Sequence, residues 1–237
     1  MAKNIIKQIT LFTLLCFFNK NAYSGSSYYE GKPAPWVGTD FKGLPCIKRP
    51  QSYGPYDYTN EKDRTSKQGG GRDTALSLVE GAHFYPDIEN LVKSRYGSFL
   101  ADFDYTLRAW PNHHRALFSL ARFQIEVNKK IRKPETEFSQ TECYFQRAIN
   151  FNPNDAVPYS LYAYLLSKLG KPDEANKYYE AALKVAPNSS KIAYAYSLFL
   201  IDTKQYDKAL EYAQKAYQNG KPPMGLQNKL KKLGVWK

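Results

Sequence analysis

The chain has 237 residues, of which 43% are hydrophobic and 24% are charged, and its formal net charge is +12. This composition excludes a wholly disordered chain and fits one ordinary domain, or a small domain joined to a repeat array. The basic excess favours anionic partners such as nucleic acid, acidic polymers or membrane headgroups, although a solvated lysine-rich surface would carry the same charge.

Residues 1–24 have the pattern of a secretory signal peptide. Two lysines lie near the start, residues 9–18 form an apolar core, and Ala22-Tyr-Ser24 is a small-x-small cleavage site. The apolar core is too short to span a bilayer comfortably, and no later stretch is apolar enough to do so. We therefore expect an exported protein, periplasmic or extracellular, with no transmembrane segment in the mature chain.

Two cysteines, Cys46 and Cys143, follow the predicted leader. An even number of cysteines in an exported protein predicts one disulfide bond between them. The competing interpretation is two unrelated thiols, with Cys143 simply buried on its helix.

Residues 25–110 are expected to form an N-terminal arm followed by short helices. The stretch 25–72 is rich in glycine, proline, serine and tyrosine and shows no helical periodicity. It holds too many aromatic side chains for a solvated tail, so we expect it to be extended and packed on the rest of the protein. These aromatic residues include Trp36, Phe41, Tyr53, Tyr56 and Tyr58.

Two short helices are predicted after this arm. Asp73 or Thr74 can cap the first of them. Pro86 interrupts the pattern, and Asp87 can cap the second. The apolar face of the second helix would comprise Ile88, Leu91 and Val92.

Two longer helices are predicted next. One covers residues 99–110 and stops before Pro111, because the residue before a proline disfavours the helical conformation. Asn112 can cap the other, which would run to about Ile131 in the first-helix slot of the earliest repeat. Its buried face would comprise Leu117, Leu120, Val127 and Ile131. The polar stretch 129–139 reads as an insertion.

A repeat with a period of 34 residues runs from Glu142 to Tyr217. Pro153 and Pro187 lie 34 residues apart, and the same spacing joins several small and aromatic residues. The further pairs are Ala148 and Ala182, Tyr162 and Tyr196, Ala175 and Ala209, and Ala182 and Ala216. This period is typical of stacked helix–turn–helix units, whose antiparallel helices approach closely where alanine lies at the crossing. We therefore predict an all-α fold.

The repeat resembles the tetratricopeptide repeat family. Within residues 156–189, the family's small and aromatic positions fall on Tyr159, Tyr162, Ala163, Leu166, Ala175, Tyr179, Ala182 and Pro187. Residues 143–155 resemble the second helix of an earlier unit, and residues 190–223 a third unit in which Lys221 stands in the proline position. The resemblance implies a solenoid of about three repeats over residues 111–223, without enzymatic activity or a cofactor.

The later helices carry their own start signals. Asp155 and either Ser189 or Ser190 are candidate N-caps, and Pro172 is expected in the first turn of its helix. A final helix within residues 224–237 would cover the last exposed apolar face of the array. Its apolar positions are Leu226, Leu230, Leu233 and Trp236.

In the resembling family, the first helix of each repeat lines a concave groove that binds proteins or peptides. Carried over to this chain, the expected binding residues are Ser160, Tyr164, Lys168, Lys191, Tyr194 and Leu198, with Val157 and Ile201 also exposed on this surface. Chaperone-binding members grip a C-terminal carboxylate with Lys and Asn, but Ser160 and Tyr164 stand at the first two of those positions. Tyrosines with lysines imply instead an aromatic floor with basic rims.

The three histidines lie close together in the sequence. They are His83, His113 and His114. Glu80 would share a helical face with His83, and Asp102 is near, so a metal-dependent or other enzyme is an alternative function. No zinc-type spacing joins these residues, and the competing interpretation is packing and hydrogen bonding between the arm and the first repeat. The polar and aromatic run over residues 102–115 allows the same two interpretations.

The sequence therefore predicts an exported, non-enzymatic scaffold that binds another protein or peptide through its groove, as an assembly adaptor of the cell envelope. No metal site and no nucleic-acid partner are expected. Besides the enzyme alternative, a binder of an acidic polymer is the third candidate.

Overall fold

The computed structural model describes residues 33–46, 50–51, 53–130 and 138–237. The predicted signal peptide over residues 1–24 lies outside these ranges, as does most of the insertion predicted at 129–139. The side chains of Val127 and Ile131, which were predicted to be buried, lie outside them too.

The regular secondary structure of the described residues is helical, which confirms the all-α fold class. In chain order the helices are α1 (Glu61–Thr65), α2 (Ala75–His83), α3 (Pro86–Glu89), α4 (Phe99–Ala109), α5 (His114–Lys130), α6 (Thr141–Phe151), α7 (Ala156–Lys168), α8 (Pro172–Val185), α9 (Ser190–Asp202), α10 (Tyr206–Gln218) and α11 (Gly225–Lys232). Within the described part of the chain, none of these helices is long and apolar enough to cross a membrane.

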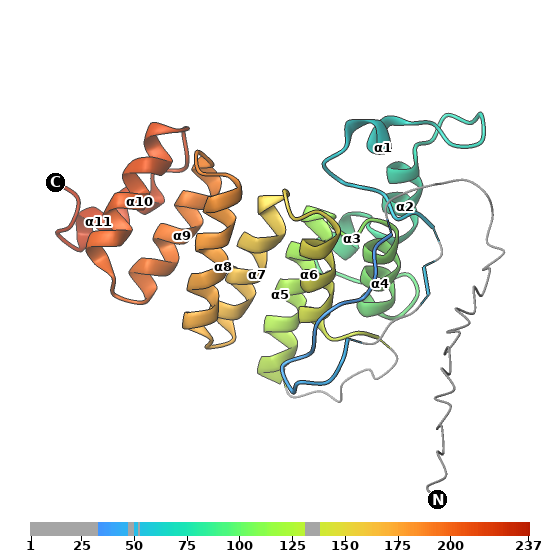
Figure 1. Ribbon diagram of the computed structural model, residues 1–237, viewed down its shortest axis with the longest axis horizontal. Coiled ribbons are helices and arrows are strands. Elements are labelled where there is room, and N and C mark those ends of the chain that lie inside the picture. The colour runs from blue at the N-terminus through green and yellow to red at the C-terminus, as the bar shows by residue number, and fades with distance from the viewer. Residues whose placement is uncertain (1–32, 47–49, 52, 131–137) are drawn as a thin grey trace, which may run out of the picture.

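Helices α5 to α10 stack as three successive pairs (Figure 1). We call α5, α7 and α9 the first helices, and α6, α8 and α10 the second helices. Each first helix contacts the next one, α5 against α7 and α7 against α9. At the end of the stack α11 packs against α9 and α10. The arrangement is the predicted helix–turn–helix solenoid with a capping helix.

Small residues lie where paired helices cross. Ala163 of α7 and Ala175 and Ala182 of α8 have no exposed surface, and neither has Ala209 of α10. Opposite Ala209, the Ser197 hydroxyl donates a 2.6 Å hydrogen bond to its carbonyl oxygen. A larger side chain at these sites would force the helices apart, because packed interiors leave no spare volume.

The predicted start signals of the repeat helices are confirmed. The Asp155 carboxylate accepts a hydrogen bond from the Val157 amide at 3.1 Å and so caps α7. Ser189 caps α9, and Pro172 occupies the first turn of α8, where its missing N–H costs no hydrogen bond. Thr74 caps α2 through a reciprocal capping box with Ser77.

Several predictions in the N-terminal half were wrong. Helix α3 begins at Pro86 itself, since proline suits the first helical position, and it ends at Glu89. Leu91 adopts a left-handed backbone with φ of 59°, and the Val92 side chain is 68% exposed, so neither belongs to an apolar helical face. The short helix α1 falls inside the stretch expected to be extended.

Two helix boundaries also differ from the prediction. Helix α5 is capped by His113 and not by Asn112, because the His113 Nδ1 atom accepts a hydrogen bond from the Ala116 amide at 3.1 Å. Helix α11 ends at Lys232, and Gly234 follows in the left-handed region with φ of 72°. Leu233 is therefore 43% exposed, while Leu226 and Leu230 are fully buried as predicted.

The series of second helices extends upstream to α4. Pro111 precedes Pro153 by 42 residues, which is the 34-residue period lengthened by eight. The steps of 42, 34 and 34 connect side chains that are all buried: Phe103, Phe145, Tyr179 and Ala213. They also connect Thr106, Ala148, Ala182 and Ala216, none of which has exposed surface. Helix α4 therefore occupies the second-helix position one repeat before α6.

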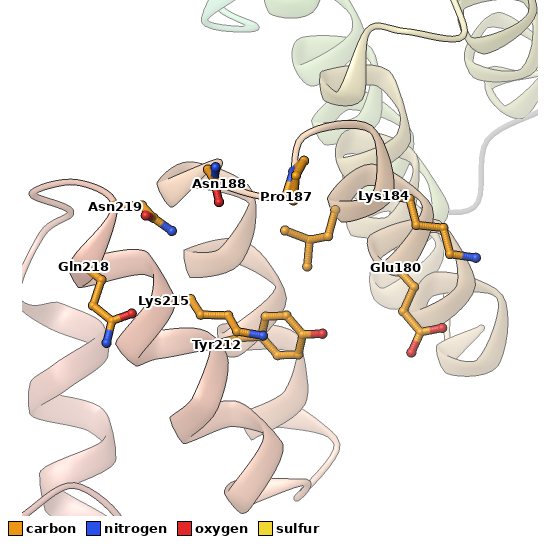
Figure 2. Close-up of a pocket in the computed structure, with 9 residues that line it drawn as sticks. Glu180, Lys184, Pro187, Asn188, Tyr212, Lys215, Gln218 and Asn219 are labelled. Atoms are coloured by element: carbon orange, nitrogen blue, oxygen red, sulfur yellow. The ribbon is translucent and has the colours of Figure 1, made fainter.

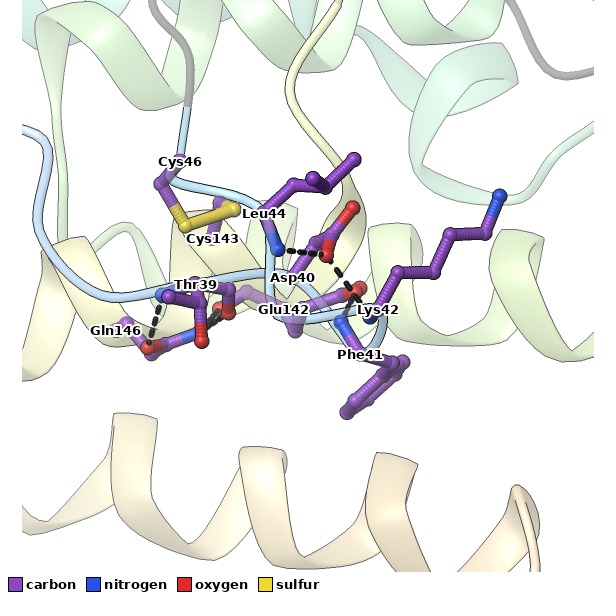
Figure 3. Close-up of a disulfide and its surroundings, with 9 residues drawn as sticks. All are labelled: Thr39, Asp40, Phe41, Lys42, Leu44, Cys46, Glu142, Cys143 and Gln146. Carbon is purple, nitrogen blue, oxygen red and sulfur yellow. Dashed lines mark hydrogen bonds between the residues drawn. A yellow bond between two sulfur atoms is a disulfide. The ribbon is translucent and has the colours of Figure 1, made fainter.

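The arm, defined here as residues 33–46, 50–51 and 53–58, docks onto α6 (Figures 1 and 3). The Phe41 amide donates a 2.7 Å hydrogen bond to the Glu142 carboxylate, and Gln146 donates to the Thr39 carbonyl oxygen at 2.8 Å. The predicted disulfide between Cys46 and Cys143 is formed beside these contacts, with Cα atoms 5.6 Å apart.

A buried arginine fixes the arm between α4 and α6. The Arg147 guanidinium of α6 donates to the Ala34 carbonyl oxygen at 2.9 Å and to Gln51 Oε1 at 2.7 Å, both in the arm. It also donates to the Leu107 carbonyl oxygen of α4 at 2.6 Å. The Trp36 ring lies under this guanidinium, 4.9 Å from its central carbon, so the arm supplies both polar and aromatic partners.

Removal of the disulfide is expected to destabilise the fold. Replacing Cys46 and Cys143 together by serine opens a loop of 97 residues, which the chain-entropy model values at about 4–5 kcal/mol. Urea denaturation of both proteins should show this loss. Added reductant should lower the free energy of unfolding of the wild type but not that of the variant. Equal stability of the two proteins without reductant would contradict a tethering role.

Candidate functional site

The exposed face of the first helices carries an aromatic pair. Phe118 of α5 is 42% exposed, and its ring lies 5.9 Å from that of Tyr164 on α7. Leu198 of α9, partly buried, holds the repeat position equivalent to Tyr164. The pair therefore forms an apolar patch that crosses from one repeat to the next.

Cationic side chains flank this patch. The Arg122 guanidinium lies 5.8 Å from the centre of the Phe118 ring, and Lys168 Nζ lies 6.0 Å from the centre of the Tyr164 ring. Lys168 also lies 3.8 Å from a carboxylate oxygen of Asp202, which accepts a 3.0 Å hydrogen bond from Lys229 as well. The first-helix face thus combines aromatic rings with a surplus of positive charge.

The structure brings together only some of the predicted binding residues. Tyr164 and Lys168 adjoin, and Lys191 is exposed at the start of α9. Tyr194 is partly buried, and a side chain added at Gly225 would lie 3.6 Å from its hydroxyl, so α11 partly covers this tyrosine.

The expected exposure of Ser160 is wrong. Only 9% of Ser160 is accessible, because α7 is the middle first helix and contacts both α5 and α9. Ile201, expected on the same surface, is buried as well. A position that is exposed on an isolated helix is covered wherever the neighbouring first helix lies against it.

Phe118 and Arg122 were not predicted from the sequence. Each precedes a predicted binding residue by 42 residues, Phe118 before Ser160 and Arg122 before Tyr164. The same spacing of 42 residues separates Pro111 from Pro153. Aligning these two prolines would have placed Phe118 and Arg122 at binding positions. Helix α5 has 17 residues against 13 in α7, which accounts for part of the lengthened step.

Each histidine pairs with a different carboxylate. His83 Nδ1 lies 3.0 Å from Asp102, His113 Nε2 lies 2.9 Å from Glu80, and His114 Nε2 lies 2.7 Å from Asp155. Asp102 and His113 are fully buried. In the part of the chain that the structure describes, no three His, Cys, Asp or Glu side chains gather in a group that could hold a metal ion.

The run over residues 102–115 forms a network at the junction of arm and repeats. Asp104 accepts hydrogen bonds from the Tyr144 hydroxyl at 2.7 Å and from Arg108 at 2.8 Å. The Asn112 side-chain amide donates to Asp57 of the arm at 2.8 Å and to Asp155 at 2.9 Å. Asp104, Asn112 and Asp155 are buried and hydrogen-bonded, which is the condition for a stable polar interior.

The tautomer of His113 is fixed by two hydrogen bonds. Its Nδ1 atom accepts from the Ala116 amide, so the proton lies on Nε2 and is donated to Glu80. Burial lowers the pKa of the imidazole below its ordinary value of 6.5, although the Glu80 carboxylate acts in the opposite direction. A second proton, on Nδ1, would displace the Ala116 amide and remove the cap of α5.

The stability of the protein is therefore expected to fall as the pH drops below about 6.5. In that range His113 is protonated in the unfolded chain but stays neutral in the folded chain. The free energy of unfolding therefore falls by at most about 1.4 kcal/mol per pH unit. Glu142, whose pKa is raised by burial, acts in the opposite direction. Urea denaturation of wild type and His113→Gln between pH 7.5 and 5 isolates the histidine, and equal slopes would refute its role.

Two family models match the chain. Both are described as tetratricopeptide repeat, and they match residues 163–222 and residues 144–175. Among curated proteins, none matches the chain.

The solved structures that are similar include a thermophilic TPR protein from Thermus thermophilus. That structure is 17% identical, covers 58% of this chain and 72% of its own, and has a TM-score of 0.47. A structure of MamA is 18% identical over 67% of this chain and 81% of its own, with a TM-score of 0.42. A second MamA structure is 19% identical over 61% and 72%, with a TM-score of 0.41.

Proposed function

Because the chain is a tetratricopeptide-repeat protein, with matched repeats over residues 144–222, we propose that it is a non-enzymatic scaffold that binds a partner protein through its first-helix face. The repeat fold is in general a platform for protein–protein interaction. We further propose that the protein is exported and acts as an adaptor in assembly at the cell envelope.

The observation that carries this proposal is the aromatic pair of Phe118 and Tyr164 with its flanking cations. Aromatic and arginine side chains commonly dominate the binding energy of protein interfaces. Adjacent first helices contact each other, so the pair belongs to a continuous surface that spans two repeats. An extended segment lying across α5, α7 and α9 would meet apolar and cationic side chains in turn.

The chemistry of this face defines the partner that it fits. Arg122 and Lys168 place positive charge beside the rings, and Lys191 is exposed at the start of α9. Asp202 is already paired with Lys168 and Lys229. A peptide that carries an apolar side chain next to a carboxylate would complement both features. An acidic polymer without apolar groups would use only the charges, and its binding would fall steeply with salt.

Export is supported by two independent features. The leader pattern of residues 1–24 is that of a secretory signal, and the Cys46–Cys143 bond is compatible with an oxidising compartment. The three histidines, each paired with a carboxylate, support a structural role for the region on which the enzyme alternative was based.

The proposal predicts a site-specific crosslink. A photoreactive benzoylphenylalanine in place of Phe118 should capture the partner in the native host, because this ring is an exposed member of the aromatic pair. The same residue in place of Tyr206, which is 36% exposed on α10, is the matched control. Capture should be read as a discrete adduct on denaturing gels.

Charge reversal tests the specificity of that adduct. Arg122→Glu with Lys168→Glu should reduce the adduct at least tenfold, since both cations would become anions beside the rings. Lys177→Glu with Lys231→Glu changes the net charge equally at exposed sites outside the face. Equal capture by both double variants, with unchanged melting, would exclude the first-helix face as the binding site.

A further inference from the structure

A hollow of about 640 Å³ lies between the second helices α8 and α10 (Figure 2). Glu180 and Lys184 of α8 line one side, and Tyr212 and Lys215 of α10 line the other. Leu183 and the Pro187-Asn188 turn close it at the end of α8. This hollow is built from second helices, so it is distinct from the first-helix face proposed above.

The groove between α4 and α6 has the same construction two repeats earlier. Positions in α4 correspond to positions in α8 after 76 residues, as Pro111 corresponds to Pro187. Positions in α6 correspond to positions in α10 after 68 residues, which is twice the 34-residue period. Leu107 of α4 accordingly corresponds to Leu183, which lines the hollow.

The charged and aromatic side chains of the two sites match in kind. The corresponding pairs are Asp104 with Glu180, Arg108 with Lys184, Tyr144 with Tyr212, and Arg147 with Lys215. Each acid corresponds to an acid, each cation to a cation, and tyrosine to tyrosine. The intervening groove between α6 and α8 lacks this set, because Gln146, Asn150, Tyr178 and Ala181 stand at its corresponding positions.

In the α4–α6 groove this set of side chains binds the arm. Arg147 donates to the Ala34 carbonyl oxygen, and Arg108 donates to the Pro50 carbonyl oxygen at 2.8 Å. The Trp36 ring packs edge-on against the Tyr144 ring, with 5.0 Å between their centres, and lies under Arg147. The groove thus holds an extended, proline-containing segment by its carbonyl groups and by one large aromatic side chain.

We propose that the α8–α10 hollow is a second site of this kind, which binds an extended segment with a tryptophan or tyrosine next to proline. Tyr212, which corresponds to Tyr144, contacts the aromatic ring of the segment, and Lys215, which corresponds to Arg147, lies 4.6 Å from the centre of the Tyr212 ring. Lys184 and Lys215 are the donors to backbone carbonyl groups. A hollow of this size admits one such side chain with its flanking backbone, since small-ligand sites span roughly 300–1,000 Å³.

The occupant that we infer is a segment of a partner protein. The arm of the same chain has the required chemistry, but it already fills the α4–α6 groove and is tied there by the Cys46–Cys143 bond. A second copy of the chain holds its own arm in the same way. In the described part of the chain this arm is therefore not free to enter the hollow, and we infer a partner segment of the same composition.

The two sites differ in the hydrogen-bond partners of their charged side chains. Asp104 is bound to Tyr144 across the α4–α6 groove, whereas Glu180 is bound to Lys208 and to the Tyr196 hydroxyl. Lys215 pairs with Glu211 on its own helix. The two walls are therefore linked by the hydrogen bond from Lys208 of α10 to Glu180 of α8, in place of a bond from the tyrosine that corresponds to Tyr144.

The test uses a synthetic peptide of the arm, Pro-Ala-Pro-Trp-Val-Gly, from residues 33–38. A fluorescent version should bind the disulfide-intact protein saturably in an anisotropy titration. Tyr212→Ala and Lys215→Ala should each weaken binding at least tenfold, as should tryptophan-to-alanine replacement in the peptide. Tyr206→Ala and Lys231→Ala are the matched controls, exposed outside the hollow, and should bind normally.

A photoreactive peptide then identifies the site. With benzoylphenylalanine in place of its tryptophan, it should label residues of α8 and α10. Absence of saturable binding, labelling of α4 and α6 instead, or affinity unchanged by Tyr212→Ala in a protein that melts normally would each overturn the proposal. Phe118→Ala, which alters the first-helix face, should leave binding of the peptide to the hollow unchanged. A failure of one proposal can therefore be told apart from a failure of the other.

Discussion

The N-terminal half of the protein depends on the buried guanidinium of Arg147. Burial lowers its pKa to about 10, yet the charge persists at neutral pH and must be compensated by hydrogen bonds. Two of the oxygens that accept from it belong to the arm, at Ala34 and Gln51, and a third belongs to α4 at Leu107. Without the arm the cation would lose most of these partners, so arm, α4 and α6 must assemble together.

The C-terminal half follows a simpler constraint. Its helices are spaced by small residues such as Ala163, Ala182 and Ala209, which are fully buried at the crossings. Contacts there link elements that are near in sequence, and each pair is covered by the next. The array is therefore stabilised by packing between neighbours, with α11 covering its end.

The sequence was informative where structure depends on local or periodic features. The 34-residue period predicted the repeat helices, and Asp155, Pro172 and Ser189 predicted their starts, because caps act within one turn. The path of the arm could not be predicted in this way, because its contacts are between residues far apart in sequence. The Phe41 amide, for example, is hydrogen-bonded to Glu142, 101 residues later. The same limit applies to His113, whose cap depends on Glu80 being placed opposite it.

The candidate site was only partly predictable for a related reason. A period assigns residues to a helix face, which placed Tyr164 and Lys168 together, but the exposure of Ser160 depends on the two helices beside it. Phe118 was missed because eight additional residues shift its register. The hollow between α8 and α10 depends on the distance between two second helices, and the residue pattern of a single helix does not predict that distance.

The disulfide also determines how mechanical load passes through the chain. A pull between the arm and the C-terminus enters at Cys46 and crosses the sulfur atoms to Cys143 in the first turn of α6. Helices α1 to α5, with the histidine network, lie inside the closed loop and carry no tension along the covalent chain. A chain stretched from its arm and its C-terminus would therefore extend the helices after Cys143 first, while the junction keeps its native contacts.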